Sequence, residues 1–294
     1  MGKRVLITGS SGMLGVNLST ELDGSYEIHG MDIASCRQPI AERFHECDIT
    51  DRKGVSDVVV TLKPDIVVHM AAWTDVDGCE LDSRKAYEIN SNGTDNVAFA
   101  CKSSGATLVY ISTDFVFDGK KKAPYKEEDD TAPLSVYGLT KLKGEEAVRK
   151  RLKGYFILRT SWLFGACGKN FVDTIIDKAR SGATLKVVDD QVGSPTYTKD
   201  LAKAIHILMG KSEYGIYHVS NSGSVSWYDY ARAIISASHL SAKVEPISSG
   251  ELGRPAKRPA MSVLDNSKFV QLTGYRMRPW KEAVEEYILQ KKTV

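Results

Sequence analysis

A tyrosine and a lysine four residues apart are the pair in this sequence best suited to proton transfer. Tyr137 and Lys141 occur in YGLTK, within a stretch from 135 to 150 whose pattern predicts a helix. Residues i and i+4 share one face of a helix, so the two side chains would lie together. An ammonium group beside a phenol lowers a pKa that is otherwise about 10. Tyr137 could then exchange a proton with a substrate oxygen near neutral pH.

A hydroxyl group at the end of a predicted strand could join this pair. The run TLVYIS (107–112) predicts a buried strand, and Thr113 and Asp114 follow it directly. Ligands bind at the carboxyl ends of strands in open α/β sheets, so Thr113 could reach the same substrate oxygen as Tyr137. The alternative is that Thr113 only forms a hydrogen bond to the backbone at the strand end.

Three glycines near the start of the chain have the spacing of a phosphate-binding loop. Gly9, Gly12 and Gly15 lie in TGSSGMLG, after a predicted strand (4–8) and at the opening of a predicted helix (12–22). Gly9 would permit a tight turn, Gly12 would let the backbone approach a pyrophosphate, and Gly15 would allow close packing of helix on strand. The free N–H groups of the helix start would face the phosphates. A plain strand-to-helix turn is the alternative.

Acidic residues further along could hold the adenosine end of such a cofactor. Asp32 ends the second predicted strand, where a carboxylate can accept hydrogen bonds from ribose hydroxyls and so favour NAD over NADP. Ser35 and Arg37 come next and could instead hold a 2′-phosphate, which leaves the choice of cofactor open. Asp48 and Ile49 could border the adenine, although Asp48 taken alone is more typical of the N-cap of the next helix.

The elements that must position these residues alternate between strands and helices. Strands are predicted at 4–8, 26–32, 65–71, 107–112 and 155–160, and helices at 12–22, 51–62, 82–103 and 135–150. Such alternation predicts a parallel sheet with right-handed crossovers, and the apolar strands fit a sheet that is buried on both faces. We therefore expect the α/β class, with a Rossmann-type doubly wound parallel sheet.

The second half is less regular, and we expect it to form a smaller C-terminal substrate-binding lobe. Helices are predicted at 170–181, 199–209, 227–237 and 280–290, short strands at 185–188 and 216–219, and an extended or looped segment at 253–259. A boundary near residue 160 would divide a cofactor-binding domain, 1–160, from a mainly substrate-binding lobe, 161–294. We also expect the chain to cross between the lobes.

The composition of the chain argues against several classes of binding partner. The 294 residues carry 39 Lys plus Arg against 37 Asp plus Glu, and a net charge of +2 offers no electrostatic case for nucleic acid or a membrane surface. No apolar stretch approaches the roughly 20 residues that span a bilayer, and we expect no signal peptide. The five cysteines are scattered without a CxxC pair, which favours reduced thiols and a cytoplasmic protein over disulfides or a zinc site.

Longer segments connect these motifs to a known family. TGSSGMLG, the strand-end STD and YGLTK, in this order, resemble the extended short-chain dehydrogenase/reductase superfamily, and within it the chain is similar to the dTDP-4-dehydrorhamnose reductase family. The segments that carry the narrower resemblance cover nearly the whole chain: HMAAWTDVDGCE (69–80), ISTDFVFDG (111–119), APLSVYGLTKLKGE (132–145), RTSWLFG (159–165), DDQVGSPTY (189–197), WYDYA (227–231) and RPAMSVLD (258–265).

This resemblance implies roles for the residues at matching positions. Thr113, Tyr137 and Lys141 would be the catalytic residues, and Tyr137 and Lys141 would also contact the cofactor. Further cofactor contacts would come from the glycine loop and from the loop after the third strand: Gly12, Met13, Leu14, Ala72, Trp73 and Thr74. The nucleotide-sugar substrate would meet four residues: Thr113, Asp114, Trp162 and Arg258.

Two positions depart from the family pattern. Phe115 stands where many members have Tyr, so a hydroxyl group is missing beside Tyr137. Asn17 stands where some members carry a Glu that takes part in a metal-linked dimer contact, so we predict no metal. Arg258 suits a diphosphate because a guanidinium matches phosphate geometry.

The resemblance implies an NAD(P)H-dependent oxidoreductase that reduces the C4 ketone of dTDP-4-dehydro-L-rhamnose to dTDP-L-rhamnose. Its cofactor would be NADPH or NADH, its partner a nucleotide-sugar substrate rather than nucleic acid or a membrane, and a homodimer is compatible with the sequence. A related nucleotide-sugar epimerase or 4-ketoreductase is one alternative. A non-catalytic regulatory subunit on the same fold is another, because fold alone does not determine function.

Overall fold

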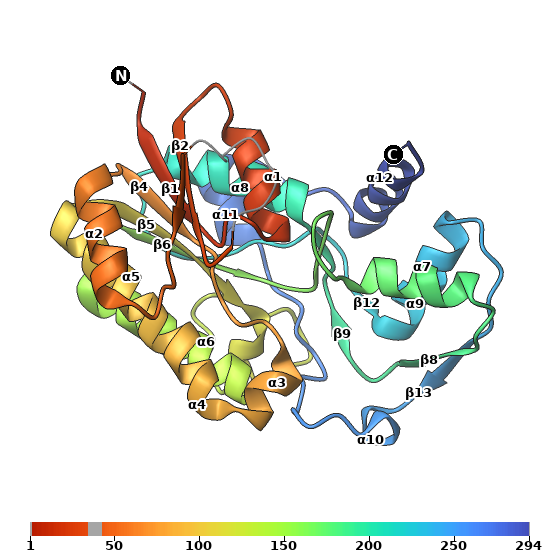
Figure 1. The fold of residues 1–294 in the computed structure, drawn as a ribbon. Coiled ribbons are helices and arrows are strands. Elements are labelled where there is room, and N and C mark those ends of the chain that lie inside the picture. Colours follow the sequence, from red (N-terminus) through yellow and green to blue (C-terminus); the bar gives the residue numbers. More distant parts are fainter. Residues whose placement is uncertain (1, 35–42, 294) are drawn as a thin grey trace.

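A seven-stranded parallel sheet organises the larger of two lobes in the computed structural model, which describes residues 2–34 and 43–293 (Figure 1). The strand order is β11–β6–β5–β4–β1–β2–β3, and every neighbouring pair is parallel. The strands are β1 (Arg4–Thr8), β2 (Glu27–Asp32), β3 (Phe44–Glu46), β4 (Ile66–His69), β5 (Thr107–Thr113), β6 (Tyr155–Thr160) and β11 (Gly215–His218). The expected α/β class and doubly wound parallel sheet are confirmed.

The order of the strands reverses beside β1. The chain first adds β2 and β3 on one side of β1, and then adds β4, β5, β6 and β11 on the other side. In sheets of this kind the two loops at the reversal separate, and ligands bind in the crevice outside the carboxyl ends of the strands, here β1 and β4. The glycine loop follows β1 and therefore lies at this crevice.

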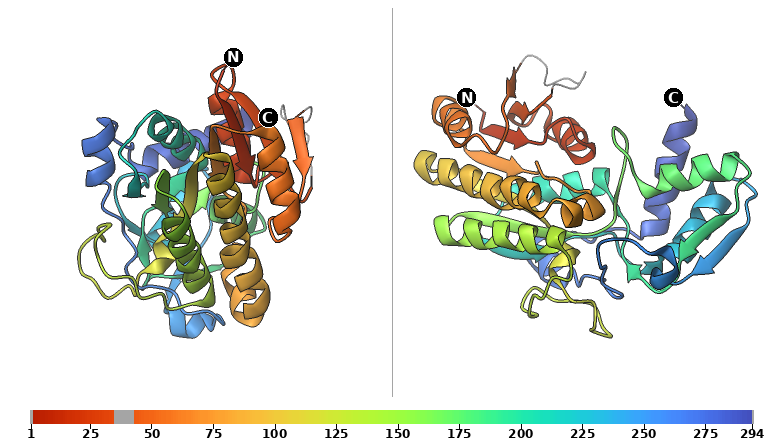
Figure 2. Two further views of the ribbon diagram at one scale, coloured as in Figure 1. Left: turned by 90° about the vertical axis from the view of Figure 1, so that its left-hand side faces the viewer. Right: turned by 60° about the horizontal axis from the view of Figure 1, so that its bottom comes forward.

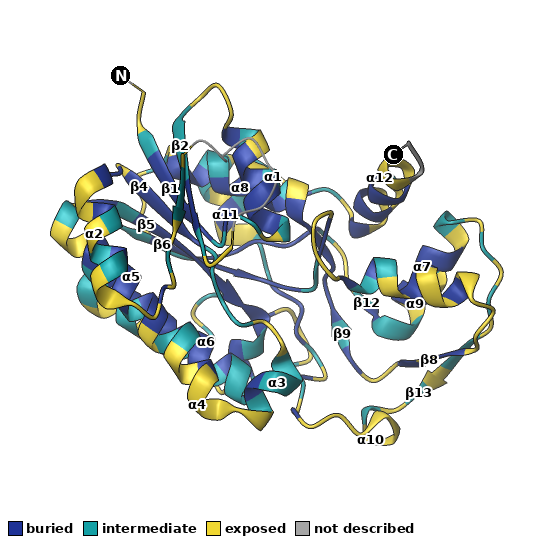
Figure 3. Ribbon diagram, in the orientation of Figure 1, coloured by how far each residue is buried: buried dark blue, intermediate teal, exposed yellow. Residues whose placement is uncertain are grey.

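Helices cover both faces of the sheet (Figure 2). One face packs against α1 (Met13–Leu22), α8 (Thr198–Met209) and α11 (Ser267–Thr273), and the other against α2 (Arg52–Leu62), α5 (Thr94–Ser104) and α6 (Val136–Arg151). Neighbouring strand residues point to opposite faces, and in the central strands β1, β4, β5 and β6 most residues are apolar and buried, whereas β2, β3 and β11 are partly exposed (Figure 3).

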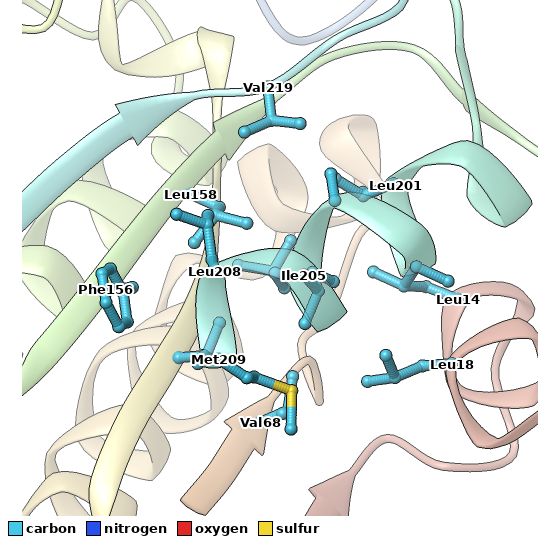
Figure 4. Close-up of a cluster of buried hydrophobic side chains, with 14 of the residues drawn as sticks. Leu14, Leu18, Val68, Phe156, Leu158, Leu201, Ile205, Leu208, Met209 and Val219 are labelled. Carbon is cyan, nitrogen blue, oxygen red and sulfur yellow. The ribbon is translucent and has the colours of Figure 1, made fainter. Parts of the chain in front are cut away.

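The core on the α1 side contains leucine, isoleucine and valine side chains from six elements. Leu14 and Leu18 of α1 face Ile205 of α8, and both helices lie over Val68 and Leu158 of the sheet (Figure 4). All five side chains are buried, and Leu18, Val68, Leu158 and Ile205 are fully so. This packing fixes the position of the first turn of α1, and therefore of the glycine loop, relative to the sheet.

One predicted helix is interrupted. The stretch 82–103 was expected to be continuous, but the structure has a short α4 (Ser83–Ala86), a π-helical segment η2 (Tyr87–Gly93) and then α5. Within η2 the buried Asn90 side chain accepts a hydrogen bond from the Trp73 N–H (2.8 Å) and donates one to the Trp73 carbonyl oxygen (3.0 Å). π-helical turns of this type are rare and frequently lie at functional sites.

The smaller lobe has its own apolar core. It packs α7 (Phe171–Arg180), α9 (Trp227–Ala237) and α12 (Trp280–Thr293) with the parallel pair β8 (Leu185–Val188) and β13 (Val244–Ile247). Between these elements the chain returns to the larger lobe, where α8 packs on α1 and β11 pairs with β6. The remaining short elements are α3 (Val76–Leu81), η3 (Asp114–Val116), β7 (Leu163–Phe164), β9 (Val192–Gly193), β10 (Thr196–Tyr197), β12 (Val225–Ser226) and α10 (Ser249–Leu252). None of the described helices is both long enough and apolar enough to cross a membrane.

We expect Leu158→Ala to lower the free energy of unfolding by about 2–5 kcal/mol, because it leaves a cavity in a fully buried position. Urea denaturation followed by circular dichroism measures this change. Val60→Ala on the exposed side of α2, where the side chain is 50% exposed, is the control and should change stability by no more than about 0.5 kcal/mol. Equal effects of the two substitutions would contradict the packing described above.

Candidate active site

The helix that carries the YGLTK motif lies unusually close to the sheet. Ser135 caps α6 by accepting a hydrogen bond from the Gly138 N–H (3.3 Å). A Cβ atom at Gly138 would lie 2.2 Å from the Phe115 carbonyl oxygen, and one at Gly144 would lie 2.4 Å from the Tyr110 hydroxyl. Both glycines are therefore required for α6 to approach η3 and β5, and this approach brings Tyr137 to the carboxyl end of β5.

Tyr137 lies on the first turn of α6, beside η3 and the carboxyl end of β5. Its ring meets Phe115 edge-on, with centroids 5.6 Å apart. Burial raises the pKa of the Tyr137 phenol well above its ordinary value; the Thr113 hydroxyl opposes this shift and the Asp114 carboxyl adds to it. The phenol is consequently protonated near neutral pH, as a donor must be. The structure thus brings Tyr137 and Thr113 together, as the sequence predicted. The expectation that Lys141 lowers the pKa of Tyr137 is wrong for the protein without ligands, because burial of the phenol dominates and raises its pKa.

Lys141 lies one helical turn further along α6 and is buried. Its Nζ donates a hydrogen bond to the Ile111 carbonyl oxygen (2.7 Å) and lies 4.2 Å from the centre of the Tyr110 ring. Burial lowers the pKa of Lys141 to about 7, and the Glu145 carboxylate opposes that shift. Both the ammonium and the neutral amine of Lys141 are therefore accessible near neutral pH, and nearby charges shift the balance between them.

The strand end at Thr113 holds two polar side chains. The Thr113 hydroxyl accepts a hydrogen bond from the Phe115 N–H (3.2 Å) and donates one to Asp114 Oδ1 (3.0 Å), so it caps η3 as well as facing Tyr137. Asp114 Oδ2 is buried and has no hydrogen-bond partner among the described residues. Burial raises the pKa of Asp114 to about 7, against the lowering effect of the Ser262 and Thr113 hydroxyls. Buried polar atoms nearly always have a hydrogen-bond partner, so this oxygen is an exception.

The three glycines of the first loop differ in their surroundings. Gly9 has φ +71°, and a Cβ there would lie 2.7 Å from the Ala71 nitrogen. A Cβ at Gly15 would lie 2.5 Å from the carbonyl oxygens of Gly9 and Ser10. Gly12 is exposed, and a Cβ there would meet only the Gly9 carbonyl oxygen, at 3.4 Å. The start of α1 carries no side-chain cap at Gly12, so its N–H groups fit a pyrophosphate.

Met13 and Leu14 open α1 beside this loop. Leu14 is buried in the core beneath it, whereas Met13 is partly exposed. A Cβ at Gly168, in the loop after β7, would lie 2.4 Å from Met13 Cγ. Asn17, the position that departs from the family pattern, donates to the Met13 carbonyl oxygen (2.9 Å) and to Thr198 Oγ1 (3.1 Å).

The acidic residue that ends β2 is hydrogen-bonded to the glycine loop. Asp32 accepts hydrogen bonds from the N–H groups of Ser11 (3.0 Å) and Ile33 (2.8 Å). Its carboxylate therefore orients the loop and keeps acceptor capacity for a ribose hydroxyl. Ser35 and Arg37, the alternative contacts for a 2′-phosphate, lie outside the described residues.

Asp48 is exposed, and its carboxylate accepts from the Thr50 N–H (2.8 Å) within its own turn. The N-cap of α2 is Asp51, which accepts from the Lys53 N–H (3.0 Å), so the interpretation of Asp48 as that cap is wrong. Ile49 beside it is buried in the core below α5.

The loop after β4 borders the crevice from the other side. Ala72 and Trp73 are partly buried, and Thr74 is exposed. The Trp73 backbone is fixed by Asn90, and the Lys85 ammonium lies 4.7 Å from the centre of the Trp73 ring. Contacts from η2 and α4 therefore fix the position of this loop.

Trp162, two residues after the end of β6, adopts a left-handed backbone conformation with φ +49°. Its indole stacks on Trp227, with ring centroids 3.5 Å apart and planes 8° from parallel. A Cβ at Gly193 would lie 2.4 Å from Trp162 Cε2, so the ring also packs closely on the backbone of β9. These contacts hold the ring rigidly, and they cover part of the surface that a ligand could use.

Arg258 contacts the larger lobe. Its Nη1 and Nη2 donate to Asp77 Oδ1 (3.1 Å) and Oδ2 (3.0 Å), and Arg254 Nη1 donates to the same carboxylate (3.2 Å). Burial would raise the pKa of Asp77, but the hydrogen bonds from Arg258 and the Ala256 N–H hold it below its ordinary value. The segment after α10 thus crosses from the smaller lobe to α3 (Figure 1).

The segments that carry the family resemblance meet around this crevice. β9, in DDQVGSPTY, pairs with β12, and its Val192 exchanges backbone hydrogen bonds of 2.8 Å with Ala260 and Ser262 of RPAMSVLD. A Cβ at Gly119, which ends ISTDFVFDG, would lie 2.6 Å from Pro259. The sequence did not point to Asn90 or Asp77, because their partners are distant in the chain and only the folded structure brings them together.

The sheet, the open glycine loop at its switch point and the Tyr/Lys pair at the carboxyl edge define a dinucleotide-dependent oxidoreductase of the short-chain dehydrogenase/reductase class. A family model described as the RmlD substrate binding domain matches residues 3–293, and the chain belongs to this family.

Individual relatives agree with this membership. The chain is 42% identical to the spore coat polysaccharide biosynthesis protein SpsK of Bacillus subtilis (99% of this chain, 98% of that one). It is 37% identical to the dTDP-4-dehydrorhamnose reductase of Aggregatibacter actinomycetemcomitans (96% and 97%). A crystal structure of dTDP-4-dehydrorhamnose reductase from Bacillus anthracis in complex with NADP is similar over 99% of this chain and 100% of that one, with a TM-score of 0.92 and 41% identity. The predicted family is confirmed.

We expect Gly12→Ala to weaken cofactor binding and Gly15→Ala to lower the stability of the protein. The Cβ at Gly15 collides with backbone oxygens and should lower the free energy of unfolding by about 1–3 kcal/mol. The Cβ at Gly12 has room in the protein alone but occupies the approach to the phosphates, so stability should persist while NAD(P)H affinity falls by roughly tenfold or more, about 1.4 kcal/mol. Thermal melts and NADPH fluorescence titrations measure the two quantities, and a Gly12→Ala protein that binds NADPH normally would exclude this loop from the phosphate site.

Proposed function

We propose that this protein is an NAD(P)H-dependent reductase that converts the C4 ketone of dTDP-4-dehydro-L-rhamnose into the alcohol of dTDP-L-rhamnose. The observation that carries the proposal is the meeting of Tyr137 and Thr113 at the carboxyl end of β5, beside the crevice that the glycine loop borders. The relatives named dTDP-4-dehydrorhamnose reductase, similar over nearly their full length, support the choice of substrate.

The residues present fit a dinucleotide. The uncapped start of α1 at Gly12 and Met13 would hold the pyrophosphate, and Asp32 would hold the adenosine ribose. Ala72 and Trp73 would form the edge of the crevice. Asp48 and Ile49 remain our proposal for the adenine end, and Leu14 supports the loop from below. When bound, the nicotinamide supplies the hydride for the ketone carbon.

The protein itself positions the ketone and supplies the proton. Thr113 would turn its hydroxyl from Asp114 Oδ1 to donate a hydrogen bond to the ketone oxygen and hold it beside Tyr137. Tyr137, protonated because its phenol is buried, gives its proton to the oxygen as negative charge develops there. Lys141 as an ammonium stabilises the phenolate that remains and so favours this transfer.

The smaller lobe would complete the substrate site. Asp114 would accept a hydrogen bond from a sugar hydroxyl at its unpartnered oxygen. Trp162, held by Trp227, would offer the uncovered edge of its ring to the sugar or base. Arg258 would turn its donors from Asp77 to the diphosphate, or share them between the two anions. We also retain the prediction of a cytoplasmic enzyme with no nucleic-acid partner, and of a homodimer.

One assay tests the function directly. Oxidation of NADPH and of NADH is followed at 340 nm with enzymatically prepared dTDP-4-dehydro-L-rhamnose, and the sugar product is identified by NMR spectroscopy. Formation of dTDP-L-rhamnose supports the proposal. Turnover only with another 4-keto sugar nucleotide would identify a related 4-ketoreductase, interconversion of epimers without net oxidation would identify an epimerase, and no turnover would favour a regulatory subunit.

Tyr137→Phe should lower kcat by about 10²–10⁴-fold, the usual contribution of a positioned proton donor, and leave the dissociation constant of NADPH nearly unchanged. Single-turnover kinetics and fluorescence titration separate the two effects. Tyr214→Phe, at a tyrosine that is 46% exposed, is the matched control and should behave as the wild type. Near wild-type hydride transfer in Tyr137→Phe would remove this residue from the mechanism.

Arg258→Ala should raise KM for the nucleotide-sugar by about 10–150-fold, corresponding to about 1.5–3 kcal/mol for a lost charge-assisted contact. NADPH affinity should stay nearly constant. Arg254→Ala is the control, because Arg254 contacts the same Asp77 carboxylate but is more exposed. If Arg258→Ala weakened NADPH binding and left the sugar KM unchanged, the assignment of Arg258 to the substrate would be wrong.

A further inference from the structure

A buried ion pair continues the row of reactive side chains on α6. Tyr137, Lys141 and Glu145 are spaced four residues apart and share one face of the helix. Glu145 is fully buried, and its partner Arg159 on β6 is 2% exposed. Nothing in the mechanism above uses either residue, although they lie one helical turn beyond the lysine on which it depends.

The geometry of this pair is highly constrained. Arg159 Nε donates to Glu145 Oε1 (2.9 Å), Arg159 Nη2 donates to Oε2 (2.7 Å), and the Ser112 hydroxyl donates to Oε1 (2.5 Å). Arg159 Nη1 has no hydrogen-bond partner among the described residues, and the guanidinium carbon lies 5.1 Å from the centre of the Phe117 ring. The pair therefore ties α6 to β5 and β6 directly beneath the candidate catalytic residues.

Stability alone explains such an arrangement poorly. Removing two charges from water costs several kcal/mol for each ion, and well-packed apolar side chains often replace a buried pair without loss of stability. The unpartnered Nη1 adds to that cost. A local electrostatic role is a better explanation, because a carboxylate one turn from a buried ammonium favours its charged form.

We propose that Glu145, fixed by Arg159 and Ser112, is a positioning residue that keeps the Lys141 ammonium protonated and thereby ready for the cofactor and Tyr137. This inference rests on the role proposed above for Lys141. It adds a residue that touches neither substrate nor cofactor and acts through the lysine.

Apart from Asp114, the titratable groups around Lys141 do not change their charge in the pH range in which Lys141 titrates. On β4, burial lowers the pKa of His69 to about 3, and on β5, burial raises the pKa of Tyr110 well above its ordinary value. Both are therefore neutral between pH 5 and pH 9. On α6 the Tyr137 phenol is protonated in the same range, and Asp114, which titrates near pH 7, faces Tyr137 from η3. A measurement of cofactor binding rather than turnover reduces the contribution of Asp114, which we place at the substrate.

The test is the pH dependence of NADH binding to wild type and Glu145→Gln, measured by fluorescence between pH 5 and pH 9. NADH carries no phosphate monoester that titrates in this range. Protonated Lys141 should favour binding, so affinity should fall as the pH rises through its pKa. In Glu145→Gln this fall should occur about one pH unit or more lower, since a neighbouring opposite charge typically moves a pKa by about 1–3 units.

Two further variants distinguish this role from a structural one. Glu145→Asp keeps the charge and should return the midpoint toward that of the wild type, whereas Glu146→Gln, which removes an exposed carboxylate paired with Lys143 on the same helix, should leave it unchanged. If Glu145→Gln does not fold, the double change Glu145→Gln with Arg159→Gln replaces both charges and should move the midpoint in the same direction.

Loss of affinity by the same factor at every pH, with an unmoved midpoint, would overturn the proposal and leave Glu145 a structural residue. Failure of the Lys141 role itself is recognised separately: Lys141→Met would then bind NADH with the pH dependence of the wild type. In that case the midpoint would belong to another group, and neither Glu145 nor Lys141 would set it.

Discussion

Seven strands that all run in one direction impose the constraint on which the site depends. Each carboxyl end lies at the same edge of the sheet. The glycine loop after β1, the loop after β4, Thr113 at the end of β5 and Trp162 after β6 are therefore gathered at one edge, although the first and the last are about 150 residues apart. The reversal of strand order beside β1 then opens the crevice between the first two of these loops.

A second requirement is the short distance between α6 and the sheet. A proton donor on a helix reaches a substrate at a strand end only when the helix lies against the strand, and here Gly138 and Gly144 make that possible. The same closeness buries Lys141 and Glu145 and removes them from water. Burial is what makes the charge of Lys141 sensitive to its neighbours, because a low dielectric strengthens each interaction.

The smaller lobe is joined to the larger one through polar contacts near the crevice. Val192 pairs with the segment that follows Arg258, and Arg258 itself meets Asp77 on α3. A partly buried carboxylate held by two arginines leaves guanidinium donors close to the place proposed for the diphosphate. An arginine that is already oriented loses less side-chain entropy when it binds a phosphate, which is a physical advantage of such a contact.

Local pattern was sufficient for much of this protein. Strands at 4–8, 155–160 and 185–188 and the helix at 227–237 agree with the structure at both ends, because apolar periodicity and neighbouring glycine or polar residues act over a few positions. Spacing within one helix also placed Tyr137 and Lys141 on a common face. The motifs in order identified the family, since their residue types are required by the cofactor loop and the proton donor.

The sequence by itself could not determine the interactions between residues that are distant in the chain. The π-helical turn at Asn90 depends on the backbone of Trp73, the pairing of Arg258 with Asp77 spans the two lobes, and the burial of Glu145 against Arg159 requires α6 to lie on β6. None of these has a local signal, because a glutamate or an arginine in a sequence looks like a solvated surface charge. Only the tertiary structure decides which charges lose their water, and that loss of water gives them their effect on the site.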